Sequence, residues 1–160
     1  MERQQGALDG CKLTRRVRGD LPLRDHRRFS LLFYAYGHTQ VLVRGYPSNG
    51  GDGDGPELEP ALDLLFSNVW RVSCWKEWTS LALRTATAEE RAALERRIGE
   101  IRSTRKVFLL SEDSIENYII AGSVAWAEHY LTEYHAGPLW NRVPGPAREV
   151  AIVGDVIYRD

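Results

Sequence analysis

The 160-residue sequence predicts an α+β domain: a mainly antiparallel curved sheet, or a partly open β-barrel or sandwich, of about seven strands with one covering helix over residues 87–103. Three observations support this class. Most apolar segments alternate with a period of two, and only one segment has helical spacing. Strands and helices also do not alternate along the chain, which argues against a doubly wound parallel sheet.

Residues 1–28 are expected to form a loosely ordered basic arm before a single domain at 29–160. The arm carries eight Lys or Arg and four Asp or Glu, a formal charge of +4, whereas the rest of the chain carries −5. It sustains no hydrophobic period, so it offers little apolar surface for burial. A docking arm is the alternative to a solvated tail.

The first strands are expected over 29–36 and 39–46, joined as a hairpin by a tight turn at Gly37-His38. A third strand follows over 62–72, and its even positions, Trp70 among them, should face the core. A short turn near 75–78 leads to a strand over 80–86. We expect this strand to pair with 62–72 in antiparallel fashion.

Thr87 and Glu90 form a capping-box pattern that predicts the start of the single helix. Apolar residues recur within it at helical spacing, and Gly99 weakens the pattern without ending it. Two further strands are expected over 106–111 and 117–128, and Gly122 should leave a gap or bulge in the second. One face of that second strand should carry Tyr118, Ile120, Val124 and Trp126. A last hairpin is expected around Gly154-Asp155.

The stretch YPSNGGDGDGPELEP at 46–60 contains four acids that could be considered as metal ligands: Asp52, Asp54, Glu57 and Glu59. The helical calcium loop requires oxygen ligands at alternate positions, and Pro56 stands where the third would fall. Glycine flexibility and repulsion between carboxylates instead predict a connector between strands. No metal site and no cofactor are expected there.

Ser73-Cys74-Trp75 resembles the end of the Cys-Gly-Ser-Cys-Trp signature of papain-like cysteine proteases, in which the last Cys is the nucleophile. The resemblance implies a base at His129 or His135 and an orienting amide at Asn141. Arg71 and Val72 stand where that signature has Cys and Gly, and Cys74 follows a predicted strand without a helix N-terminus to activate it. A structural cysteine is the preferred interpretation.

His129, Glu133 and His135 are residue types that bind zinc, but their spacing matches no zinc motif. A polar strand end is the preferred interpretation. A hydrolase centred on Cys74 or on His129 and His135 remains an alternative function.

The turn Trp75-Lys76-Glu77-Trp78 is the clearest surface signal, because both tryptophans of one short turn cannot easily point inward. Exposed tryptophan is frequent at the centre of protein interfaces. We therefore expect a non-catalytic protein-binding domain, of which an inhibitor or immunity-like partner of a bacterial toxin is one concrete version. The binding residues would be Trp75, Lys76, Glu77 and Trp78 with Asp52, Asp54, Glu57 and Glu59. A barrel that holds a small apolar ligand near Phe33, Tyr34, Phe66 and Trp126 is another alternative.

Composition narrows the remaining classes. A net charge of −1 and the lack of a recognisable nucleic-acid motif argue against nucleic-acid binding. The polar start of the sequence and the lack of a long apolar run lead us to expect a cytoplasmic protein with no membrane partner.

Overall fold

The computed structural model describes residues 21–35, 39–47, 61–129 and 156–158. These residues form nine strands and one helix. In chain order they are β1 (Leu23–Ala35), β2 (Gln40–Tyr46), β3 (Ala61–Ser67), β4 (Arg71–Ser73), β5 (Glu77–Thr85), α1 (Ala88–Ile98), β6 (Lys106–Leu109), β7 (Tyr118–Ala121), β8 (Ser123–His129) and β9 (Val156–Tyr158).

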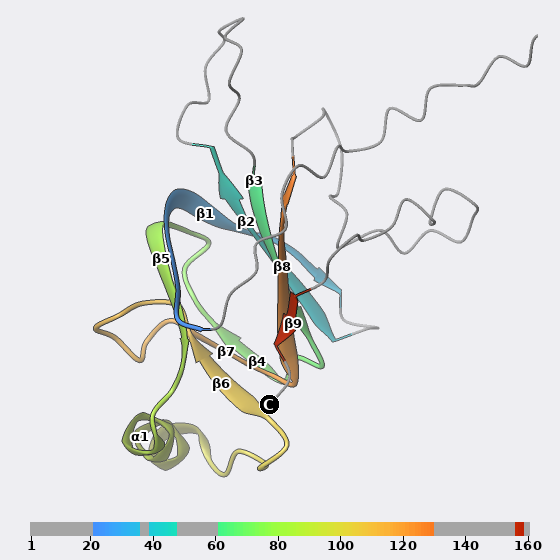
Figure 1. The fold of residues 1–160 in the computed structure, drawn as a ribbon. Coiled ribbons are helices and arrows are strands. Elements are labelled where there is room, and N and C mark those ends of the chain that lie inside the picture. The colour runs from blue at the N-terminus through green and yellow to red at the C-terminus, as the bar shows by residue number, and fades with distance from the viewer. Residues whose placement is uncertain (1–20, 36–38, 48–60, 130–155, 159–160) are drawn as a thin grey trace, which may run out of the picture.

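The strands form one sheet in the order β4-β7-β6-β5-β1-β2-β3-β8-β9, and every pairing is antiparallel. Because β4 and β9 stand at the two ends of this order, the sheet is open. Figure 1 shows that it is strongly curved, with α1 at the lower left, on the side of β6 and away from β8 and β9. The expected fold class, an open antiparallel curved sheet with one helix, is confirmed.

Strand β1 begins at Leu23, within the segment 1–28 that the sequence analysis assigns to the arm. Its first half pairs with β5 and its second half with β2, which places β1 at the centre of the sheet. Alternating exposed and buried positions from Leu23 onward support this assignment. Residues 1–20 lie outside the described residues, as do the Gly37-His38 turn and the first piece of the expected last hairpin.

Two irregular residues divide segments that each look like one strand in the sequence. Asn68, with φ 54°, separates β3 from β4. Gly122 separates β7 from β8, and its N–H donates to the carbonyl oxygens of Ser67 and Asn68 at 3.0 and 3.2 Å. A β-carbon at Gly122 would lie 3.2 Å from the Asn68 side chain. Because these two breaks lie against each other, the sheet bends at this level.

The break at Gly122 also exchanges the two faces of the strand segments on either side of it. Val124 and Trp126 belong to the main core cluster, as do Ile119 and Ala121. Tyr118 and Ile120 instead belong to a second cluster, so the expected single face for 118, 120, 124 and 126 is wrong.

After Asn68, Trp70 lies between β3 and β4 and is 41% exposed, with the Arg105 guanidinium 4.9 Å from its ring centroid. The expected core position of Trp70 is therefore also wrong. The chain leaves regular strand geometry between Asn68 and β4, so the alternation within β3 does not extend to Trp70, although Val72 still packs against the main core cluster.

The expected pairing of 62–72 with 80–86 is wrong as well. β3 pairs with β2 and β8, whereas β5 pairs with β1 and β6. β5 thus lies at the middle of the sheet, between two strands that are distant from it in the sequence.

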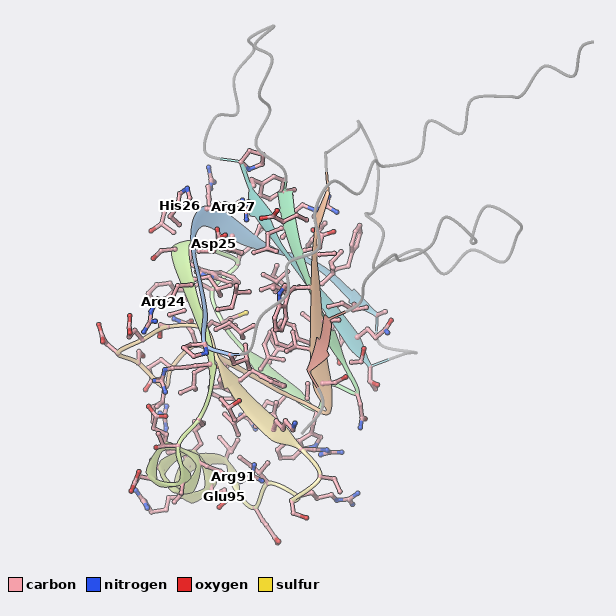
Figure 2. All side chains as sticks on the ribbon, viewed as in Figure 1. Arg24, Asp25, His26, Arg27, Arg91 and Glu95 are labelled. Carbon is pink, nitrogen blue, oxygen red and sulfur yellow. The ribbon has the colours of Figure 1, made fainter. Side chains whose placement is uncertain are left out.

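Helix α1 begins with the expected capping box between Thr87 and Glu90 but ends at Ile98, not at residue 103. Gly99 has φ 91° and donates its N–H to the Glu95 carbonyl, which closes the last turn. Arg91 then donates to the carbonyl oxygens of Ile101 and Arg105 at 2.7 and 2.8 Å. Figure 2 shows Arg91 and Glu95 at this end of the molecule.

The main core cluster lies inside the curved sheet and includes Phe29, Phe66, Phe108 and Trp126. The second cluster joins Leu94 of α1 to residues of β6 and β7. The helix therefore covers only the β6–β7 end of the sheet. No helix among the described residues is long and apolar enough to cross a membrane.

Candidate functional site

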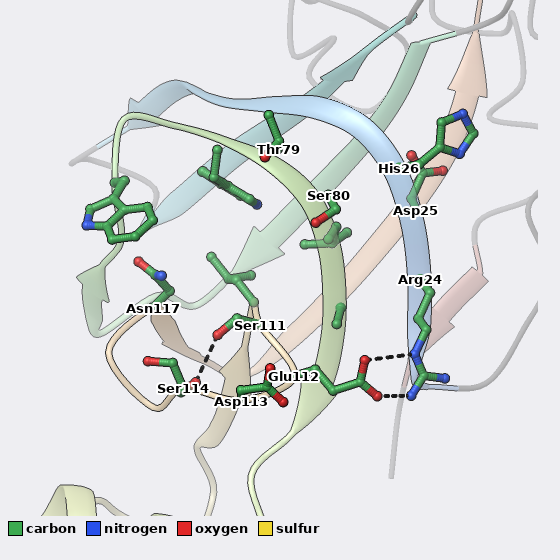
Figure 3. Close-up of a pocket in the computed structure, with 15 residues that line it drawn as sticks. Arg24, Asp25, His26, Thr79, Ser80, Ser111, Glu112, Asp113, Ser114 and Asn117 are labelled. Carbon is green, nitrogen blue, oxygen red and sulfur yellow. Dashed lines mark hydrogen bonds and ion pairs between the residues drawn. The ribbon is translucent and has the colours of Figure 1, made fainter.

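A cavity of about 640 Å³ lies where β5 and β6 diverge, and we call it the β5 pocket. Its size is within the range of small-molecule and side-chain binding sites. Figure 3 shows β5 along one side and the loop between β6 and β7 along the other. Its lining residues are Arg24, Asp25, His26, Trp75, Trp78, Thr79, Ser80, Leu81, Ala82, Leu110, Ser111, Glu112, Asp113, Ser114 and Asn117.

The β5 side of the pocket contains an irregular backbone. Ser80 has φ 62°, a left-handed conformation that non-glycine residues rarely adopt. The pairing of β5 with β1 changes register there, between Asp25 and Arg28 of β1. Thr79 and Ser80 are both exposed.

The opposite side is the loop 110–117, and hydrogen bonds hold its shape. Leu110 N–H donates to the Asn117 carbonyl at 3.0 Å. Ser111 Oγ donates to the Ser114 carbonyl at 3.0 Å, and Glu116 N–H donates to Ser114 Oγ at 3.0 Å. A loop closed by its own backbone and side chains has little freedom to collapse into the pocket.

Three arginines from three different elements attach this loop to the rest of the fold. Arg84 of β5 donates to the carbonyl oxygens of Ser111 and Glu112 at 3.3 and 3.0 Å. Arg24 of β1 forms an ion pair with the Glu112 carboxylate (Figure 3). Arg97 of α1 pairs with Glu116 at 2.8 Å.

These ion pairs shift the acidity of the carboxyl groups. Hydrogen bonds from Arg24 and Arg97 lower the pKa of Glu112 and of Glu116, respectively. Both carboxylates are therefore charged over the physiological pH range. Because both are exposed, their ion pairs contribute little to stability, and the loop is held mainly by its own hydrogen bonds and by those from Arg84.

The two tryptophans of the sequence-predicted turn both line the pocket, in different environments. Trp75 is 68% exposed. Trp78 is half-buried and stacks on Phe29 of the core, with ring centroids 6.0 Å apart. The expectation that they cannot both point inward is confirmed. Trp78 Nε1 is buried without a hydrogen-bond partner among the described residues.

The remaining predicted binding residues are placed as follows. Lys76 is exposed, and its carbonyl accepts the Leu31 N–H at 2.9 Å. Glu77 forms an ion pair with Arg28, which lowers the pKa of its carboxyl group. Asp52, Asp54, Glu57 and Glu59 lie outside the described residues. Trp75 and Trp78 are thus the predicted residues that the pocket brings together.

Cys74 is a free thiol that packs against the main core cluster. Burial raises the pKa of this thiol, which is opposite to the activation that a nucleophilic cysteine needs. His129 ends β8 opposite Ala61, while Glu133 and His135 lie outside the described residues. Within the described part of the chain, no three His, Cys, Asp or Glu side chains are placed to hold a metal ion.

The four residues suggested for an apolar ligand do not surround one space. Phe33 and Tyr34 are 41% and 54% exposed, whereas Phe66 and Trp126 are fully buried in the main core cluster. Phe66 also packs edge-on against Phe108, with ring centroids 5.6 Å apart.

Sequence reasoning missed the loop 110–117 and Ser80 as parts of a site. The run Ser111-Glu112-Asp113-Ser114 was interpretable only as a turn, and nothing in it indicates that it faces Trp75. No protein-family model, no curated protein and no solved structure matches this chain.

Proposed function

We propose that the chain is a protein-binding domain whose contact surface is Trp75 together with the β5 pocket. The observation that carries the proposal is an indole ring that is 68% exposed at a cavity of about 640 Å³. A large apolar side chain that stays exposed to water does not stabilise the fold of the isolated protein. Covered by a partner, such a side chain is a frequent centre of binding energy.

The composition of the pocket supports a partner with a basic surface. One arginine and three carboxylates line it, a formal charge of −2 with His26 neutral. Acidic surfaces accelerate association with basic proteins and discourage acidic ones. A bacterial toxin with a basic surface, inhibited by this chain, is the more specific form of the proposal.

Site-specific photo-crosslinking tests the proposal. Benzoylphenylalanine replaces Trp75 in one variant and Trp70 in a second, and each is irradiated in cells of the organism that encodes the chain. Trp70 is a matched control, since it is 41% exposed and lies outside the pocket lining. We expect a discrete adduct with one protein from position 75 and none from position 70.

Adducts of equal yield from both positions, or no adduct from position 75 under conditions in which the chain is folded, would contradict the proposal.

A further inference from the structure

We infer that the β5 pocket receives a short extended segment of the partner, which pairs with the second edge of β5 and places a lysine or arginine side chain in the pocket, whose lining includes Trp75 and Asp113. This inference rests on the proposed function and specifies how the partner is recognised. Its evidence is the pairing of β5, the rigidity of the facing loop and the charge of the lining.

Over most of its length, β5 is paired with another strand along only one of its two edges. β1 pairs with β5 over residues 77–83, whereas β6 pairs only with Arg84 and Thr85. A final backbone contact joins Ala82 N–H to the Leu110 carbonyl at 3.2 Å, and the chain then turns into the loop 110–117. No described strand covers the second edge of residues 77–81, which faces the pocket.

An edge of this kind can accept a strand from another protein. Main-chain hydrogen bonds then supply affinity, and pockets for alternate side chains supply specificity. The left-handed conformation of Ser80 interrupts regular pairing, which limits the added segment to a few residues. Such an interruption also discourages unspecific pairing between sheet edges.

The facing loop is already in place before a partner binds. Its own hydrogen bonds close it, and Arg84 of β5 donates to its Ser111 and Glu112 carbonyl oxygens. A preorganised site loses less conformational entropy on binding than a mobile one. The segment would therefore enter a slot with two fixed walls.

The charge of the slot favours a cation. Asp113 is exposed, and among the described residues its carboxylate acts on Arg84 through charge alone, without a hydrogen bond or a close ion pair. Glu112 and Asp25 are each paired with an arginine, so Asp113 is the carboxylate left for a ligand. The exposed face of Trp75 attracts a cation and covers the aliphatic stem of a lysine or arginine.

A display library of random short peptides, selected on the full chain, tests this inference without a known partner. Enriched peptides are expected to carry a lysine or arginine among β-branched residues. In ¹⁵N NMR titrations an enriched peptide should shift the backbone amides of residues 77–82 and the Trp75 indole. Asp113→Asn should weaken it about three- to tenfold, whereas Glu100→Gln, at an exposed acid beyond α1, should not.

Backbone pairing is tested with the same peptide carrying N-methylated amides, which should not bind. Retained binding of that peptide, or enrichment of acidic or neutral sequences, would overturn the inference. So would a library that enriches nothing. If crosslinking at position 75 still captures one protein in that case, the protein-binding function stands and only the extended cationic segment is wrong. If peptides bind but position 75 captures no protein, the pocket accepts an extended cationic segment and the proposed protein-binding function is wrong.

Discussion

At the scale of single residues, the Glu90 carboxylate joins the start of α1 to β5. It accepts two hydrogen bonds from Arg84, at 2.7 and 2.8 Å, and one from Thr87 N–H at 2.9 Å. These bonds lower the pKa of Glu90 to about 2, and the hydrogen bonding with Arg84 has the largest effect. The capping box was predictable from Thr87 and Glu90, but the participation of Arg84 was not.

Replacement of Glu90 by Gln should reduce the acid sensitivity of the fold. A carboxyl group whose pKa is lowered by folding stabilises the native state above its unfolded pKa and loses that contribution as pH falls. The window for Glu90 therefore runs from its ordinary value of 4.5 down to about 2. Urea unfolding should show that Glu90→Gln is about 2 kcal/mol less stable than the native chain near neutral pH. The unfolding free energies of the two proteins should become equal near the lower end of this pH window. A constant difference across the window would contradict this assignment.

Arg44 and Asp63 form a buried ion pair across β2 and β3. Arg44 Nε and Nη2 lie 2.7 and 2.9 Å from the two carboxylate oxygens, and the side chains are 5% and 0% exposed. Asp63→Asn leaves a buried guanidinium without its counter-charge and should lower the unfolding free energy by about 3–5 kcal/mol. The double change Arg44→Met with Asp63→Leu should be much milder. Equal losses for the single and double variants in urea unfolding would show that the charge pairing is unimportant.

At the scale of elements, alternation predicted where most strands lie but not how their faces or partners are arranged. Residues 118–121 and 124–127 are apolar on both faces, so the pattern cannot reveal that Gly122 exchanges them. Likewise, the pairing of β5 with β1 brings together segments about fifty residues apart, and local preference carries no information on such contacts.

The register of the β1–β2 pair depends on the lack of a side chain at Gly45, which lies opposite Phe29. A β-carbon at Gly45 would lie 2.6 Å from Cε1 of the Phe29 ring, which is fully buried. Gly45→Ala should therefore cost about 1–3 kcal/mol through overpacking. Adding Phe29→Leu should restore part of this loss, so a double-mutant cycle in thermal unfolding should be non-additive. Strictly additive effects would show that the ring and Gly45 do not constrain each other.

At the scale of the whole molecule, the curved sheet brings residues 24–26, 75–82 and 110–117 around one pocket. The sequence identified Trp75 and Trp78 because their local surroundings are unusual. It could not identify the pocket, because its walls meet only through the divergence of β5 and β6. The central claim is that this composite surface, with Trp75 at its exposed corner, binds another protein.

Isothermal titration calorimetry of the crosslinked partner, once purified, with Trp75→Ala and Trp70→Ala variants tests this claim most directly. Both tryptophans are exposed, so both variants should keep the native unfolding temperature. Trp75→Ala should weaken binding about 30-fold or more, equivalent to about 2 kcal/mol, and Trp70→Ala should leave the affinity unchanged. Equal affinities for Trp75→Ala and the native chain, or a loss that is as large for Trp70→Ala, would contradict the account.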